Sequence, residues 1–181
     1  MKKLYLLLLF VVVAATSCTK SSGEQKVINR VKVGNEVPDF TVTDQDGDPR
    51  SFTLSDYEGF DATIITFIST GCSDCKREMP KIYEVYDHFD GSGMLQVINI
   101  GRAETAENMA QYWESIDPDN NKGDFGDMPW YLDPGREAYD LFANIKVPRI
   151  YLVDSSGEVV WMAVEKMDES AQDIIEMINN L

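Results

Sequence analysis

The sequence predicts an α/β fold in which a central mixed sheet is flanked by helices. Short runs of β-branched and aromatic residues, typical of buried strands, alternate along the chain with amphipathic segments of helical period. The order strand, helix, strand predicts a parallel βαβ unit with a right-handed crossover. The length of 181 residues allows one domain with a full core behind an N-terminal leader, but not two domains.

The first 17 residues have the pattern of a secretory signal peptide. Two lysines precede an apolar run over residues 4–15, which is shorter than the roughly 20 residues of a membrane-spanning helix. Residues 14–18 resemble the lipobox of bacterial lipoproteins, and this resemblance implies cleavage before Cys18 and lipidation of Cys18. An ordinary signal peptide that contains a cysteine is the alternative. Residues 18–32 are then the lipidated cysteine and a tether, and the folded domain is expected over 33–181.

The charge of the chain limits its partners. Removal of Lys2 and Lys3 with the leader leaves 14 of the 16 basic residues against 31 acidic ones, so the net charge falls from −15 to −17. We expect no nucleic-acid partner, because phosphate binding requires a basic face. The expected location is the cell envelope, with the domain in the periplasm and anchored to a membrane by lipid.

The domain is predicted to begin with a β-hairpin. Apolar and β-branched residues over 37–43 and 51–54 flank a turn-rich stretch, 44–49. Residues 55–60 are expected to form a loop or a single turn. The run from Ala62 to Ile68 predicts a central strand that is buried on both faces.

A helix is predicted to start at Ser73, directly after a small-residue turn over 69–72. It should end near Gly91, and its apolar face contains Met79, Ile82, Tyr83, Tyr86 and Phe89. A second core strand is predicted over 95–100, followed by a helical segment over about 106–115.

The remainder of the chain predicts an exposed loop over 117–127 and a closing ββα unit. Residues 150–153 and 158–163 form its hairpin, and the last helix follows. The apolar face of that helix contains Ala171, Ile174, Ile175, Ile178 and Leu181. This is the order of a thioredoxin-like fold with an N-terminal hairpin extension and an insert after the second core strand.

Cys72 and Cys75 remain as a pair once Cys18 is assigned to the lipobox. They lie three residues apart where a central strand meets a helix, so their sulfurs can come within bonding distance. The helix N-terminus favours the thiolate of Cys72, which we predict to be the nucleophile, with Cys75 as the resolving thiol. An inert disulfide is the alternative, although so small a loop adds little stability. We expect no metal, because a zinc site takes four cysteine or histidine ligands, and the chain has only these two cysteines and one histidine to supply.

The residues around this pair resemble the TlpA and ResA group of membrane-anchored thiol-disulfide oxidoreductases, which belong to the thioredoxin superfamily and are related to the AhpC/TSA proteins. The resemblance covers about residues 33–181. Its motifs are Val33-Gly34, Val37-Pro38-Asp39-Phe40, Cys72 to Pro80, and Val147-Pro148. It implies substrates that are disulfides or dithiols of exported proteins, a membrane electron donor, and no cofactor.

The resemblance also implies roles for three further residues. Glu78, one turn beyond Cys75, would be a proton acceptor or donor for the buried thiol if burial raised its pKa. An ordinary solvated glutamate is the alternative. Pro148 would be a cis-proline that faces the dithiol and presents the Val147 backbone to a substrate strand, and a trans proline at the start of an edge strand is the alternative.

Among the departures from the family pattern, which include Gly71 where many members have a tryptophan and Ser73-Asp74 between the cysteines, two bear on the thiol chemistry. Thr66 stands where cytoplasmic thioredoxins have a buried aspartate, so their proton route cannot be transferred to this chain. Asp74 lies between the cysteines, where its charge would oppose the Cys72 thiolate by about 0.6 kcal/mol in water-like surroundings. We therefore expect Asp74 to make the pair less oxidising.

The leading functional interpretation is a thiol-disulfide oxidoreductase, a reductase or exchange enzyme of exported proteins that works through a mixed disulfide. A peroxidase of the peroxiredoxin type is a second interpretation, although it would want a Pro and a Thr where this chain has Ile65 and Ser69. A redox-inactive, membrane-anchored binding module is the third.

Overall fold

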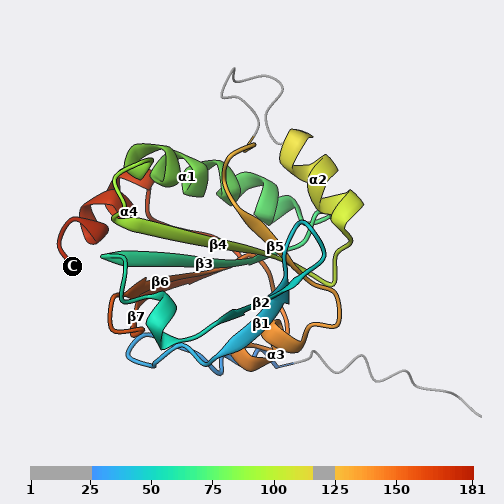
Figure 1. Cartoon of the computed structure of the whole chain (residues 1–181), viewed down its shortest axis with the longest axis horizontal. Helices are drawn as coiled ribbons and strands as arrows, with labels where there is room; N and C mark the ends of the chain where they lie inside the picture. The colour runs from blue at the N-terminus through green and yellow to red at the C-terminus, as the bar shows by residue number, and fades with distance from the viewer. Residues whose placement is uncertain (1–25, 116–124) are drawn as a thin grey trace, which may run out of the picture.

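The computed structural model describes residues 26–115 and 125–181, which form a seven-stranded mixed sheet with helices on both faces (Figure 1). The order of the strands is β2-β1-β5-β4-β3-β6-β7. The strands are β1 (Phe40–Thr43), β2 (Pro49–Phe52), β3 (Ala62–Ile68), β4 (Leu95–Arg102), β5 (Trp130–Asp133), β6 (Arg149–Asp154) and β7 (Val159–Val164). The helices are α1 (Ser73–Phe89), α2 (Ala106–Ser115), α3 (Glu137–Phe142) and α4 (Ala171–Ile178), with a 3₁₀ turn, η1, at Leu54–Asp56.

The predicted N-terminal hairpin is confirmed. β1 and β2 pair in antiparallel fashion from Phe40 opposite Phe52 to Thr43 opposite Pro49. Thr43 also pairs with Leu132 of β5, so the hairpin extends the core sheet at one edge.

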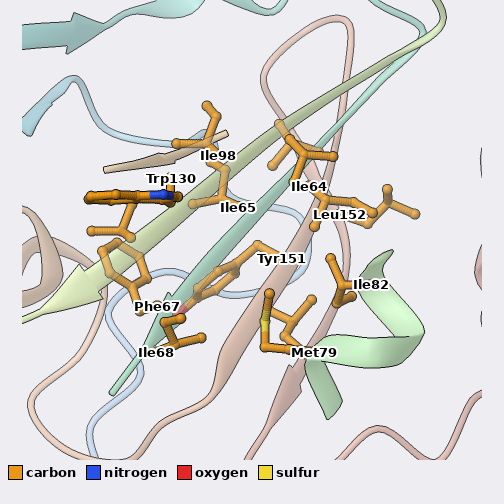
Figure 2. Packing of buried hydrophobic residues seen from close by; sticks show 14 of the residues in the cluster. Ile64, Ile65, Phe67, Ile68, Met79, Ile82, Ile98, Trp130, Tyr151 and Leu152 are labelled. Atoms are coloured by element: carbon orange, nitrogen blue, oxygen red, sulfur yellow. The ribbon is translucent and has the colours of Figure 1, made fainter. Parts of the chain in front are cut away.

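The predicted central strand is also confirmed, because all seven residues of β3 are buried. β3 pairs in parallel with β4 and in antiparallel fashion with β6. Alternate side chains point to opposite faces of the sheet. Phe67 packs against Tyr139 and Phe142 of α3 on one face, whereas Figure 2 shows Met79 and Ile82 of α1 pointing toward the sheet from the other.

Helix α1 has the start and the apolar face that the period predicts. Met79, Ile82 and Phe89 are buried, and Tyr83 and Tyr86 are partly buried. α1 packs against α4 on the same face of the sheet, while α3 lies on the opposite face (Figure 1). The carboxyl end of β3 and the start of α1 are joined by a short turn, which places this turn at the edge of the sheet where β3 ends.

The insert contains two elements that the sequence did not predict, β5 and α3. They have four and six residues, which is too short for a reliable hydrophobic period. Most of the loop predicted over 117–127 lies outside the described residues. Its described end is only partly exposed, because Phe125 is buried against Tyr83 and Trp113.

Residues 26–32, which we call the N-terminal strap, belong to the expected tether but pack on the domain. The amides of Arg30 and Val31 donate hydrogen bonds to the Phe142 carbonyl, and Val31 is buried. Asn29 Oδ1 accepts a hydrogen bond from Nη1 of the fully buried Arg149 at 2.7 Å. The signal peptide and Cys18 lie outside the described residues. Within the described residues, no helix is long and apolar enough to cross a membrane.

Candidate functional site

The two cysteines lie where β3 ends and α1 begins, and both are free thiols. Residues 69–71 connect the two elements, and Cys72 is the N-cap residue of α1. The Cys72 sulfur accepts a hydrogen bond from the backbone amide of Cys75 at 3.3 Å. The Cys72 sulfur therefore lies at the N-terminus of α1, beside an amide group that is available to a charged sulfur.

Cys75 has a different environment, because it faces the core and is fully buried. Its sulfur accepts a hydrogen bond from the Ser69 amide at 3.5 Å. Burial raises the pKa of the Cys75 thiol well above its ordinary value, and the Ser69 amide opposes this only in part. Cys75 is therefore a protonated thiol at neutral pH.

The loop before β6 completes the site opposite the cysteines. The Val147–Pro148 peptide bond is cis, so the trans alternative is wrong. The thiol of Cys72, which is half-buried, donates a hydrogen bond to the Val147 carbonyl oxygen at 3.4 Å. The structure thus brings Val147 and Pro148 together with the dithiol, although they are some seventy residues apart in sequence.

Glu78 is buried, with 1% of its side chain exposed, so the alternative of a solvated glutamate is wrong. Its carboxylate pairs with Arg77 Nε at 2.7 Å and with Lys81 Nζ at 2.9 Å. Burial alone would raise the pKa of Glu78, but these two cations bring it below its ordinary value. This direction is opposite to the rise on which the proton-transfer role was based. That role stays a prediction, now for an ionised carboxylate.

Asp74 is not an isolated charge beside Cys72. Its carboxylate pairs with Arg77 Nη1 at 2.7 Å, and both side chains are partly exposed. The guanidinium offsets the repulsion between Asp74 and the Cys72 thiolate that the sequence led us to expect. Arg77 Nη2 also donates to the Glu165 carbonyl oxygen, which ties the first turn of α1 to the segment after β7.

Glu104 is a residue of the site that sequence reasoning missed. It follows β4, is 8% exposed, and accepts hydrogen bonds from the Ser69–Thr70 turn. A signal for it was available, because β3 and β4 were predicted as adjacent parallel strands. The loops after such strands meet at one edge of a sheet, so an acidic residue after β4 should lie near the turn before Cys72.

The site has the arrangement needed for exchange between thiols and disulfides. One sulfur is half-buried and lies at a helix N-terminus, and a second lies behind it as a protonated thiol. A search against protein-family models matches residues 33–162 to the AhpC/TSA family. The chain belongs to the AhpC/TSA family.

Relatives of this AhpC/TSA chain are named for thiol chemistry. The chain is 27% identical over 154 residues to the thiol-disulfide oxidoreductase ResA of Bacillus thuringiensis subsp. konkukian, a match that covers 85% of this chain and 82% of the relative. It is 27% identical over 142 residues to ResA of Bacillus subtilis (strain 168), which covers 77% of this chain and 72% of the relative.

Solved structures confirm the predicted thioredoxin fold. The thioredoxin domain of a thiol-disulfide oxidoreductase from Bacteroides vulgatus matches with a TM-score of 0.61 at 20% identity, covering 83% of this chain and 97% of that one. A thiol:disulfide interchange protein of the thioredoxin family from Chlorobium tepidum TLS matches with a TM-score of 0.62 at 20% identity, covering 82% and 97%.

Proposed function

We propose that this thiol-disulfide oxidoreductase reduces disulfides of exported proteins, with Cys72 as the attacking thiol and Cys75 as the resolving thiol. The observation that supports this proposal is the contrast between the two sulfurs. Cys72 is half-buried at the N-cap of α1, whereas Cys75 is fully buried behind it. A partner protein can reach the first sulfur, and the second can react only with a sulfur that is already bound to the first.

The reaction has two exchange steps. The Cys72 thiolate attacks one sulfur of the substrate disulfide, that bond breaks, and the other substrate sulfur leaves as a thiolate that takes up a proton. Cys75 then loses its proton and attacks the Cys72 sulfur, which releases the second substrate thiol. Two electrons pass from the dithiol to the substrate, and the Cys72–Cys75 disulfide forms. No cofactor is needed.

Proton transfer from Cys75 is the step that its environment makes difficult, because burial raises its pKa. We assign the acceptor to Glu78, which lies one turn further along α1 and is ionised. The pairing with Arg77 and Lys81 keeps Glu78 ionised, so it has no proton to donate and can act only as an acceptor, although the same pairing makes it a weaker base. The cis Val147–Pro148 pair is assigned to substrate binding, with the Val147 backbone beside the reacting sulfur.

We also propose that residues 1–17 are a signal peptide and that Cys18 carries a lipid. The domain over residues 33–181 would then be held at a membrane in the periplasm, where a membrane-bound thiol donor returns the oxidised pair to the dithiol. The lipobox resemblance of residues 14–18 supports this part of the proposal.

The midpoint potential of the Cys72–Cys75 pair tests the direction of exchange. It is measured on the chain without residues 1–18, by alkylation and mass spectrometry after equilibration in thiol buffers. A value near that of thioredoxin, about −270 mV, is expected of a reductase, whereas a value near about −120 mV would make the protein an oxidant.

Single cysteine variants test the order of attack. Cys75→Ser should accumulate a mixed disulfide with a model substrate through Cys72, whereas Cys72→Ser should form none, because Cys75 is buried. A wild-type chain that forms no reversible disulfide would leave the binding-module interpretation in its place. If the wild-type chain consumes peroxide and Cys75→Ser does so at the same rate, the result would instead support a peroxidase.

A further inference from the structure

We propose that Glu104 is a positioning residue for thiol-disulfide exchange, which acts by holding the Ser69–Thr70 turn against both cysteines. This inference rests on the proposed function of Cys72 and Cys75. Within the described residues Glu104 makes no hydrogen bond to either sulfur, so its effect passes through the turn.

The carboxylate of Glu104 is almost completely occupied by this turn. Oε1 accepts hydrogen bonds from Ser69 Oγ and from the Thr70 amide, both at 2.8 Å. Oε2 accepts one from Thr70 Oγ1 at 3.0 Å and one from Asn108 Nδ2 at 3.3 Å. Within the described residues no lysine or arginine forms an ion pair with it. A buried anion without a cation is stable only where such donors are fixed around it.

Ser69 transmits this constraint to both cysteines. Its amide donates to the Cys75 sulfur at 3.5 Å, and its carbonyl oxygen accepts a hydrogen bond from the Cys72 amide at 3.0 Å. Its hydroxyl is the group that Glu104 holds. Every polar group of Ser69 is therefore engaged, and a rotation of this residue would disturb the contacts of Cys72 and Cys75 together.

The end of β4 and the two residues after it are shaped so that Glu104 reaches this turn. Gly101 lies opposite Ile68 in the parallel register, and a Cβ atom at Gly101 would lie 2.7 Å from Met109 Sδ and 3.1 Å from Glu104 Cβ. Ala103 has a φ of 57°, a left-handed conformation that residues with a Cβ seldom adopt. Its amide donates to the Asp133 carbonyl at 2.9 Å, which fixes this bend before Glu104.

The charge of Glu104 and its hydrogen bonds predict opposite effects on Cys72. A negative charge near the dithiol opposes the thiolate, so its removal alone would make Cys72 more reactive. The hydrogen bonds keep the turn in place, so their removal would make Cys72 less reactive. Comparison of Glu104→Ala with Glu104→Gln separates the two, because glutamine loses the charge but keeps one acceptor oxygen for Ser69 and Thr70.

The experiment measures the alkylation rate of Cys72 against pH in the reduced chain, and the rate of exchange with a model peptide disulfide. We expect Glu104→Ala to slow both at neutral pH by about tenfold, the effect of losing one hydrogen bond to a charged group, and Glu104→Gln to stay within about threefold of wild type. The control is Glu107→Ala in α2, just after Glu104, because Glu107 is exposed and within the described residues accepts only a long hydrogen bond, 3.5 Å, from Gln111. The alkylation and exchange rates of Glu107→Ala should match wild type.

Ser69→Ala keeps the test valid if Glu104→Ala folds poorly, because it removes only the hydroxyl that Glu104 holds. It should slow Cys72 alkylation, while Glu104→Gln stays near wild type. Alkylation at the wild-type rate in Ser69→Ala would overturn the inference, as would alkylation that is unchanged or faster in both Glu104 variants. A wild-type chain that alkylates normally but exchanges no disulfide would overturn the proposed function instead, while the alkylation rates would still test Glu104.

Discussion

At the scale of single residues, the environment gives two identical side chains different roles. Cys72 is half-buried, and its sulfur accepts a hydrogen bond from the Cys75 amide at the start of α1. Cys75 is enclosed by the core. Desolvation penalises the charged form of Cys75, so it keeps its proton where an exposed thiol would lose it. The same two thiols can therefore act in sequence without competing for a substrate.

The buried thiol should make the stability of the reduced protein depend on alkaline pH. The pKa of Cys75 is raised in the folded state, so its contribution is fully present below the unfolded value near 9 and is lost as pH rises above it. The free energy of unfolding should fall by up to about 1.4 kcal/mol for each pH unit in that range. Urea unfolding between about pH 8 and pH 10, with reductant present, measures this slope.

Two variants identify the source of the slope. Cys75→Ala should lose much of it, while Cys72→Ala, which leaves Cys75 buried, should keep it. The range stays below about pH 10 because Tyr57 and Tyr112, whose pKa values burial also raises, add a similar decline at higher pH. Equal slopes in wild type and Cys75→Ala would show that Cys75 is not the group responsible.

The sequence was sufficient to locate this pair but not to describe its neighbours. Two cysteines at a strand-to-helix junction need only local spacing, and that spacing predicted the N-cap position of Cys72. The state of Glu78 depends on cations one and three residues away and on contacts near position 167, so its pKa is lowered, whereas the proposed proton transfer was conditional on a raised pKa. Glu104 depends on the parallel pairing of β3 with β4, which brings distant loops together.

At the scale of elements, long periodic segments were predictable and short ones were not. β3 and α1 have the bounds that their patterns predicted, because each has enough residues to show a period. β5 and α3 were missed because four and six residues carry too little signal. Helix α3 nevertheless contributes to the site, because Tyr139 donates a hydrogen bond to the carbonyl of Lys146, the residue before Val147.

The N-terminal strap is joined to the loop before β6 through the buried side chain of Arg149. Arg149 is fully buried, and it donates to Asn29 Oδ1 at 2.7 Å and to the Ile145 carbonyl at 2.8 Å. Asn29→Ala leaves one nitrogen of this guanidinium without an acceptor. We expect a loss of about 1–3 kcal/mol in the free energy of unfolding, measured by urea denaturation.

Asn144→Ala is the matched control for the strap. The Asn144 side chain also bonds the strap, through the Ile28 amide and the Lys26 carbonyl, but it does so at the surface. Water can replace these contacts, so the loss should stay below about 1 kcal/mol. Equal losses in the two variants would contradict the argument that the buried guanidinium sets the cost.

At the scale of the whole molecule, the proposed anchor would hold the dithiol edge close to a membrane. The strap reaches the domain beside Asn144, and the loop from Asn144 to Pro148 leads to Cys72. The stretch from Cys18 to residue 25 can span at most about 28 Å when fully extended. A membrane-bound electron donor would then need only a short reach to the Cys72–Cys75 pair.

The anchor is tested by moving the chain off the membrane. A chain in which residues 1–18 are replaced by a signal peptide that is cleaved without lipidation should shift from the membrane fraction to the soluble fraction, because it lacks both the apolar leader and the proposed site of lipidation. Cys72→Ala should remain with the membrane. If a membrane-bound thiol donor supplies the electrons, the released chain should also hold Cys72 and Cys75 largely as a disulfide, which trapping with an alkylating reagent and mass spectrometry would detect. Retention of the chain without residues 1–18 on the membrane would contradict the lipid anchor, and a fully reduced pair in the released chain would contradict the need for a donor in the membrane.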